Sequence, residues 1–284
     1  MPDKYSLFQK IATLLPVALA VCILVFSYIN PSFVYGLAYE DGPIEYMSAL
    51  FLLLASIIML TLVGQFAKRK LWLGLAASLL ITTITFIMCM EEISWGQRIF
   101  NTSSPDFFQN KNMQQETNIH NLNTFLFQAI FYAGAFVLLT LLPFYYKNAK
   151  KALEKINLQK LIVFLPATWL FTPFVVVSGL TFVNGYLQNI TASIIAVITF
   201  ILSIVMLYRL LFKKSFIKQG AVLALAILTS SVLLITVNTL DFGHIGIPAW
   251  YVSEYKEAFI SLGILFYTIS VYTAAHKSIA KSLD

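Results

Sequence analysis

Two adjacent carboxylates, Glu91 and Glu92, stand where a long apolar stretch of this sequence ends. The stretch, LWLGLAASLLITTITFIMCM, is long enough to cross a bilayer as a helix, which places both carboxylates at the helix C-terminus. The negative end of the helix dipole disfavours carboxylates, so a carboxylate held there usually has a cation, a metal or a proton as its partner. These two residues are the first candidates for chemistry.

Other acidic residues and two histidines stand at the ends of further apolar stretches, in pairs three or four residues apart. On a helix such a pair shares one face, so each pair would present two polar groups to the same space. The pairs are Asp41 and Glu45, Glu116 and His120, Asp241 and His244, and Glu254 and Glu257.

Imidazole and carboxylate groups together make a mixed N/O ligand shell, which suits zinc, iron or manganese better than calcium. A further carboxylate would act as general base on a metal-bound water. The predicted function is therefore a metal-dependent membrane enzyme acting on a lipid, a lipid-linked sugar or a peptide. The expected metal ligands are Glu92, Glu116, His120, Asp241 and His244, and the expected catalytic residues are Glu91, Glu92, Glu116 and His120.

Several alternatives stay open. The same residues would support metal-free acid–base catalysis, with Glu91 or Glu92 as base and His120 as its partner. A transporter is a second alternative, although no charged residue stands in the middle of a predicted span. A scaffold or sensor that docks a basic domain on an acidic external face is a third. Asp41 and Glu254 also suit ordinary helix caps, which would leave them without a chemical role.

The composition identifies the class of protein that must position these groups. The 284 residues are 59% hydrophobic and 11% charged, with a mean hydropathy of +0.80, whereas soluble domains carry about 25% charged residues. We predict a single all-α integral membrane domain, a polytopic bundle of eight transmembrane helices over residues 1–284. The predicted spans are 8–29, 44–66, 71–92, 122–146, 160–183, 189–212, 219–240 and 254–276.

The distribution of charge predicts the orientation of these spans. With both termini in the cytoplasm, all but three of the 19 Lys and Arg residues face the cytoplasm, as the positive-inside rule requires. The three exceptions are Arg98, Lys111 and Lys256. Most acidic residues fall on the external side, which the rule does not require. The basic isoelectric point thus reflects topology in a cell membrane, and no nucleic-acid partner is needed to explain it.

The segment 91–121 is long for a connection between helices, so we expect a partly ordered lid over the external mouth of the bundle. Ser104-Pro105-Asp106 predicts the start of a short helix, and Phe107 would lie at the bilayer interface. The predicted pocket also includes Asp41, Glu45, Gln97, Arg98, Asn118, Glu254 and Glu257.

Three sequence segments, EDGPIEY, EEISWGQR and NMQQETNIHN, resemble a family of uncharacterised bacterial multi-pass membrane proteins over residues 40–123. The resemblance brings no activity with it. It implies that one site contains Glu91, Glu92, Trp95, Gln97, Glu116, Asn118, His120 and Asn121.

A family of glutamate-dependent intramembrane proteases has the motif order EExxxR, FxxxH and HxxxN. This sequence has Glu91, His120 and His244 in that order, but Gly96 stands at the Arg position and Pro248 at the Asn position.

Overall fold

The structure is a computed structural model that describes residues 6–39, 41–112, 114–171, 174, 186–212, 217–239 and 252–281. Every regular element in these ranges is helical, which confirms the all-α prediction. Within the described residues, six helical stretches are long and apolar enough to cross a membrane, so the chain is a multi-pass membrane protein. They lie in α1 (Leu7–Ile29), α3 (Pro43–Lys68), α4 (Trp72–Glu92), α7 (Thr124–Phe136) with its continuation to Phe144, α11 (Tyr186–Leu211) and α13 (Val252–Lys281).

A seventh long helix, α12 (Ile217–Thr239), contains a shorter apolar stretch, Gln219–Val232. The remaining elements are short and connect the long helices. They are α2 (Pro31–Leu37), η1 (Ser94–Gly96), α5 (Gln97–Phe100), α6 (Asp106–Lys111), η2 (His120–Leu122), η3 (Val137–Leu141), α8 (Leu142–Phe144), α9 (Tyr146–Lys155), η4 (Gln159–Phe164) and η5 (Thr168–Leu170).

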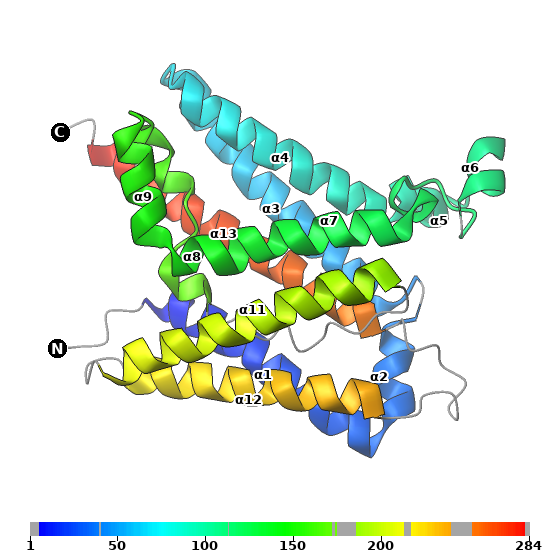
Figure 1. Cartoon of the computed structure of the whole chain (residues 1–284). Helices are drawn as coiled ribbons and strands as arrows, with labels where there is room; N and C mark the ends of the chain where they lie inside the picture. The colour runs from blue at the N-terminus through cyan, green and yellow to red at the C-terminus, as the bar shows by residue number, and fades with distance from the viewer. Residues whose placement is uncertain are drawn as a thin grey trace.

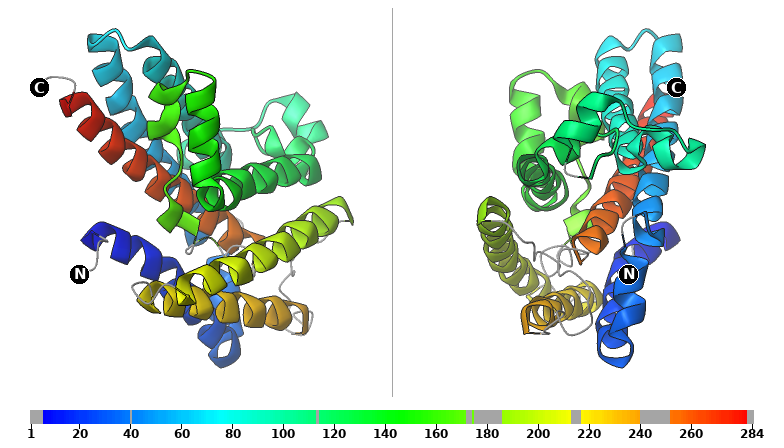
Figure 2. Two further views of the ribbon diagram at one scale, coloured as in Figure 1. Left: turned by 60° about the vertical axis from the view of Figure 1, so that its left-hand side comes forward. Right: turned by 90° about the vertical axis from the view of Figure 1, so that its right-hand side faces the viewer.

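The helices α3 and α4 form an antiparallel hairpin, and α13 packs along the other side of α3 (Figure 1). Helix α7 packs against α11, α11 against α12, and α12 against α1, which makes a second group of helices below the first (Figure 2). Residues of α13 belong to all three hydrophobic clusters, for example Phe259, Leu262 and Ile260. Helix α13 therefore joins the two groups.

Helix α13 is also the most enclosed of the six membrane-length helices. Inside the bundle, 67% of its apolar window is buried, whereas the corresponding fraction is between 17% and 39% for the others. A helix that is buried on all sides must satisfy its polar side chains within the protein. The polar side chains in the first three turns of α13 therefore need partners within the bundle. They are Lys256, Glu257 and Ser261.

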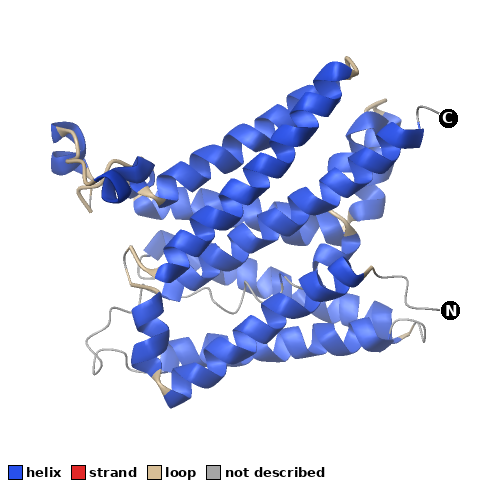
Figure 3. Ribbon diagram, turned by 180° about the vertical axis from the view of Figure 1, so that it is seen from behind, coloured by secondary structure: helices blue, strands red, loops and turns tan. Residues whose placement is uncertain are grey.

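The two ends of the bundle differ in their elements. One end of the bundle holds the first and last described residues, the α3–α4 turn and α9 (Figures 1 and 3). The opposite end holds α5 and α6. The first end carries the basic cluster Lys68-Arg69-Lys70. The second end carries the acidic termini of α3 and α4 and the start of α7, so the predicted external polar residues of these helices share one end of the molecule.

The predicted span 160–183 differs from the structure. Residues 159–170 form two 3₁₀ turns, η4 and η5, separated at Leu165–Ala167, in place of a continuous α-helix. Pro166 explains the break, because proline removes a backbone donor and disfavours the helical conformation of the residue before it. Residues 172, 173 and 175–183 of that span lie outside the described residues. The sequence pattern also gave no sign of the π-helical turn η3 that follows α7.

Candidate functional site

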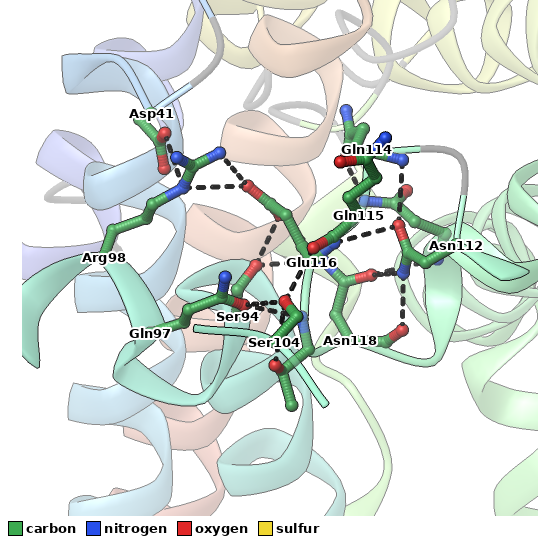
Figure 4. Close-up of polar contacts among 12 residues, drawn as sticks. Asp41, Ser94, Gln97, Arg98, Ser104, Asn112, Gln114, Gln115, Glu116 and Asn118 are labelled. Atoms are coloured by element: carbon green, nitrogen blue, oxygen red, sulfur yellow. Dashed lines mark hydrogen bonds and ion pairs between the residues drawn. The ribbon is translucent and has the colours of Figure 1, made fainter. Parts of the chain in front are cut away.

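A buried carboxylate, Glu116, organises the segment 93–123, which we call the cap (Figure 4). Its side chain is only 5% exposed. Glu116 Oε1 accepts hydrogen bonds from Arg98 Nε and Nη2 at 3.2 and 2.9 Å. Glu116 Oε2 accepts from Ser94 Oγ at 2.5 Å and from Asn118 Nδ2 at 3.0 Å. Four donor contacts to one carboxylate, two of them from the charged Arg98 guanidinium to Oε1, make Glu116 the centre of the strongest polar network of the cap.

Arg98 also ties the cap to α3. Its Nε lies 3.2 Å from Asp41 Oδ2, so one guanidinium bridges Asp41 and Glu116 (Figure 4). Burial raises the pKa of the Asp41 carboxyl, an effect that Arg98 opposes and the negative charge of Glu116 reinforces. Arg98 was a predicted pocket residue, and it pairs with these two carboxylates.

The amides of the cap hold its loops together. Gln97 Oε1 accepts from Ser104 Oγ at 2.9 Å and from the backbone N–H of Thr117 at 2.7 Å. Asn112 Nδ2 donates to the backbone oxygen and to Oδ1 of Asn118, at 2.9 and 2.8 Å. Gln97 and Asn118 were both predicted pocket residues, and both lie in this one network.

The backbone at the start of the cap adopts an uncommon conformation. Ser94, Trp95 and Gly96 have φ values of 46°, 55° and 79°, three consecutive residues in the left-handed region. Each non-glycine residue there costs about 1–2 kcal/mol. The side chains of Ser94 and Trp95 donate to Glu116 and Glu91 respectively, which offsets that cost. The two carboxylates thus fix the turn between α4 and the cap.

Glu91 connects the end of α4 to η2. Its Oε2 accepts from the backbone N–H groups of Ile119 and His120 at 2.7 and 3.0 Å, and its Oε1 accepts from Trp95 Nε1 at 2.8 Å. His120 Nδ1 lies 3.4 Å from Glu91 Oε2. The dipole of α4 disfavours the negative charge of Glu91 at its C-terminus, but the free N–H groups at the start of η2 donate hydrogen bonds to it. It positions the cap.

The predicted helical pairing of Glu116 with His120 is wrong. Residues 114–119 are not helical, and Gln115 has a φ of 58°. The Asn112 side chain accepts from the backbone N–H of Gln114 and Glu116, and such local side-chain bonds compete with helix formation. Glu116 consequently faces Arg98, whereas His120 faces Glu91.

A second group of carboxylates lies between the cap and the bundle. Glu45, Glu92 and Glu257, from α3, α4 and α13, are close enough that the charge of Glu92 interacts with those of both others. We call these three residues the carboxylate cluster. Each is half-buried. Three of the predicted acidic helix ends, those of α3, α4 and α13, therefore lie close together.

The three members of the carboxylate cluster differ in their hydrogen bonds. Glu45 accepts from the backbone N–H of Asp41 at 2.7 Å. Glu257 accepts from Gln128 Nε2 at 3.0 Å and from Tyr132 Oη at 2.9 Å. Within the described ranges, no group donates a hydrogen bond to Glu92. Glu92 is thus the carboxylate of the cluster that is available to a ligand.

Lys256 was predicted to lie on the external side but was not among the predicted site residues. Its side chain is only 1% exposed, its Nζ lies 3.3 Å from the centroid of the Tyr132 ring, and no described residue accepts a hydrogen bond from it. A signal was present: Lys256 is a cation in the first turns of a helix, where the dipole disfavours it. Glu91 and Glu92 are disfavoured by the helix dipole in the same way, as anions at a helix C-terminus.

A small cavity lies beside Lys256. Its volume is about 20 Å³, enough for about one water molecule, and Tyr132, Thr140 and Thr199 are among its lining residues. Thr140 belongs to the π-helical turn η3, an irregularity that is frequent at functional sites. Tyr132 connects this cavity to the carboxylate cluster, because its ring faces Lys256 and its hydroxyl donates to Glu257.

The metal ligands predicted from the sequence lie in separate places in the structure. Glu116 pairs with Arg98, His120 contacts Glu91, and Glu92 lies in the carboxylate cluster. Across the described ranges, no group of three or more His, Cys, Asp or Glu side chains is arranged to hold a metal ion. Asp241 and His244 lie outside the described residues. Glu254 lies half-buried in the first turn of α13.

Gly42 sets the position of Asp41 and Glu45. A Cβ at this residue would lie 2.8 Å from the backbone oxygen of Leu37 and still closer to that of Tyr39. We expect Gly42→Ala to shift Asp41 away from Arg98 and to lower the free energy of unfolding by about 1–3 kcal/mol, measured by thermal unfolding in detergent. The control is Gly64→Ala near the C-terminal end of α3, where nothing lies within 4 Å of the new Cβ. It should instead stabilise the protein by about 0.5–1 kcal/mol, and equal effects would contradict the prediction.

Comparisons with protein-family models, with curated proteins and with solved structures find no match. The geometry of the cap, the carboxylate cluster and Lys256 is therefore the basis for assigning a function.

Proposed function

We propose that this protein is a membrane enzyme that carries out acid–base chemistry at the carboxylate cluster, with Glu92 as the reacting carboxylate. The observation that carries the proposal is the contrast between two neighbours in the chain. Glu91 accepts three hydrogen bonds and holds the cap, whereas Glu92 accepts none among the described residues and faces Glu45 and Glu257. A half-buried carboxylate that accepts no hydrogen bond from a described group is available to a ligand or a proton.

The surroundings of Glu92 suit proton transfer. Neighbouring carboxylates in different environments divide the roles of general acid and general base. Glu257 accepts hydrogen bonds from Gln128 and Tyr132 and would act as an electrostatic partner, whereas Glu92 would exchange the proton. The substrate would be a lipid, a lipid-linked molecule or a peptide that reaches the cluster from the bilayer or from the external side.

The test uses the full chain in nanodiscs of mixed phosphatidylethanolamine and phosphatidylglycerol, with turnover of the lipids followed by mass spectrometry. We expect Glu92→Gln to lower turnover by about 10²–10⁴-fold, the usual contribution of a general acid or base. Glu154→Gln, at an exposed glutamate in α9, is the matched control and should leave turnover unchanged. Turnover by Glu92→Gln at the wild-type rate would exclude this role for Glu92.

The metal-dependent form of the enzyme is tested in the same preparation. It needs Asp241 and His244 in addition to Glu92, because Glu116 and His120 already have partners in the cap. Stoichiometric zinc, iron or manganese that is lost in both Asp241→Asn and His244→Ala would favour a metal-bound water as the nucleophile. Turnover that is unaffected by chelators would favour the carboxylates alone.

Transport is the second candidate, and Lys256 favours it. A buried ammonium beside a small cavity, linked through Tyr132 to Glu257, is an arrangement found along proton pathways. Proteoliposomes loaded with a pH-sensitive dye separate the two candidates. Proton flux that is abolished by Lys256→Met would favour transport, and absence of flux would favour the enzyme.

We further propose eight spans with both termini in the cytoplasm, in the cell membrane of a bacterium. The support is the grouping of the termini with the basic α3–α4 turn and α9 at one end of the bundle (Figure 1). A fluorescent-protein fusion at the C-terminus should fluoresce in cells, because the protein folds in the cytoplasm. A dark but stably inserted fusion would contradict this orientation.

A further inference from the structure

Lys256 places an ammonium group inside the bundle, where no described residue accepts a hydrogen bond from it. Its side chain is 1% exposed, and its Nζ lies over the Tyr132 ring, 3.3 Å from the ring centroid. The ring face attracts the cation but does not replace a hydrogen-bond acceptor. A buried charge is unfavourable unless an opposite charge and hydrogen bonds satisfy it, so the N–H groups of Lys256 are available to an added anion.

Glu257, the next residue of α13, interacts with the charge of Lys256 without accepting a hydrogen bond from it. Its carboxylate instead accepts from Gln128 Nε2 at 3.0 Å and from Tyr132 Oη at 2.9 Å. Consecutive residues of a helix point about 100° apart, so the two side chains leave α13 in different directions. Glu257 therefore attracts the ammonium at longer range and leaves its N–H groups unsatisfied.

The cavity beside Lys256 has the size and the donors for a small anion. Its volume is about 20 Å³, and one water molecule needs about 10–15 Å³. Thr140 of η3 and Thr199 of α11 are 4% and 1% exposed and contribute hydroxyl groups to the lining. Hydroxyl and ammonium groups can all donate hydrogen bonds to an anion. None of the described lining residues is acidic, so nothing among them repels a negative charge.

An anion suits this cavity better than a water molecule does. Water would accept one N–H bond of Lys256 but would leave the positive charge uncompensated. The attraction between opposite charges is several times stronger in the protein interior than in water, so an anion gains more at this position. Oxyanions such as sulfate and phosphate are too large for the cavity, which leaves a monatomic anion.

We propose that the cavity between α7, η3, α11 and α13 binds one small monovalent anion such as chloride. Lys256 Nζ and the hydroxyl groups of Thr140 and Thr199 hold it. The anion joins three helices that approach one another at this point, so its binding stabilises the bundle. The site goes beyond the proposed function, because it does not include Glu92 and does not depend on any reaction at the carboxylate cluster.

The experiment uses the full chain in phosphatidylcholine nanodiscs, which carry no net lipid charge, with gluconate exchanged for chloride at constant ionic strength. We expect saturable binding of one radioactive chloride ion per chain. The midpoint temperature of unfolding should rise by about 2–4 °C when chloride is in excess over its Kd, because the anion binds only the folded state. Bromide should act like chloride, whereas sulfate should have no effect. A midpoint that does not respond to chloride, or that responds equally to sulfate, would overturn the proposal.

Lys256→Met should abolish both the binding and the shift in midpoint. Lys111→Met, at an exposed lysine of α6, is the matched control and should bind chloride as the wild type does. Chloride binding by Lys256→Met at the wild-type affinity would place the anion elsewhere and overturn the assignment.

The hydroxyl donors provide a second test, which does not alter any charge. Thr199→Val and Thr140→Val keep the shape of the side chain, and each should weaken chloride binding by about tenfold, the effect of one hydrogen bond to a charged group. Thr61→Val, at an exposed threonine of α3 whose hydroxyl donates to Ile58, is the matched control and should leave the affinity unchanged. These variants also test the site if Lys256→Met does not fold. Wild-type affinity in both cavity variants would overturn the proposal.

Glu92→Gln separates the anion site from the proposed function. It should bind chloride at least as tightly as the wild type, because the substitution removes a negative charge and leaves the cavity lining intact. Chloride binding together with wild-type turnover in Glu92→Gln would exclude the proposed function and support the anion site. Loss of chloride binding in Glu92→Gln would overturn the location of the anion beside Lys256.

Discussion

Replacing Glu116 with alanine is expected to lower the free energy of opening of the cap by about 3–5 kcal/mol. The substitution removes the acceptor of Arg98, Ser94 and Asn118 at once. Arg98 then keeps Asp41 as a partner, and the two neutral donors lose a bond in a buried setting. Removing one partner of such a network costs more than the network contributes, because the other groups stay desolvated.

Limited proteolysis with trypsin measures this opening. The cap contains two trypsin sites, Arg98 and Lys111, and Arg98 is engaged by Glu116. In Glu116→Ala, cleavage after both residues should accelerate by at least about a hundredfold, because cleavage of an opened segment follows the equilibrium population of the open form. Amide hydrogen exchange of residues 114–121 should accelerate in parallel.

Two further variants serve as controls for this prediction. Glu154→Ala removes an exposed glutamate whose nearest cation, Lys150, is 3.8 Å away, and should change stability by at most about 0.5 kcal/mol. Glu116→Gln keeps an acceptor for Ser94 but loses the charge, so its effect should fall between those of the wild type and Glu116→Ala. If Glu116→Ala is no more susceptible to trypsin than Glu154→Ala, the network does not hold the cap.

The sequence predicted the fold class and most of the long helices, because apolar stretches of membrane length leave little choice of structure. Helices α3, α4 and α13 begin within two residues of the predicted spans. The span 160–183 was wrong in its first half, since apolarity alone does not distinguish a helix from the 3₁₀ turns around Pro166. In that segment the backbone rule for proline outweighs the hydrophobic pattern.

The acidic helix ends were found from the sequence, but their separate roles were not. Glu91 and Glu92 are adjacent, so their side chains point about 100° apart on the helix and face different neighbours. One reaches η2 in the cap, and the other reaches α3 and α13. Only the packing of helices distant in sequence decides which residue faces which side, and a single sequence does not record that packing.

Lys256→Met is expected to stabilise the protein by about 1–4 kcal/mol. A buried ammonium without a hydrogen-bond acceptor among the described residues is unfavourable, and methionine has a similar length and no polar group. The methionine sulfur can also replace the ammonium against the Tyr132 ring, so little packing is lost.

Thermal and denaturant unfolding of the full chain in nanodiscs measures the gain, with Lys111→Met as the matched control. Lys111 is exposed at the end of α6, so its replacement should change the free energy of unfolding by at most about 0.5 kcal/mol. A Lys256→Met variant that is less stable than the wild type would mean that the ammonium has a partner that stabilises the bundle. A gain in stability combined with a loss of activity is the signature of a residue that is retained for function at the expense of the fold.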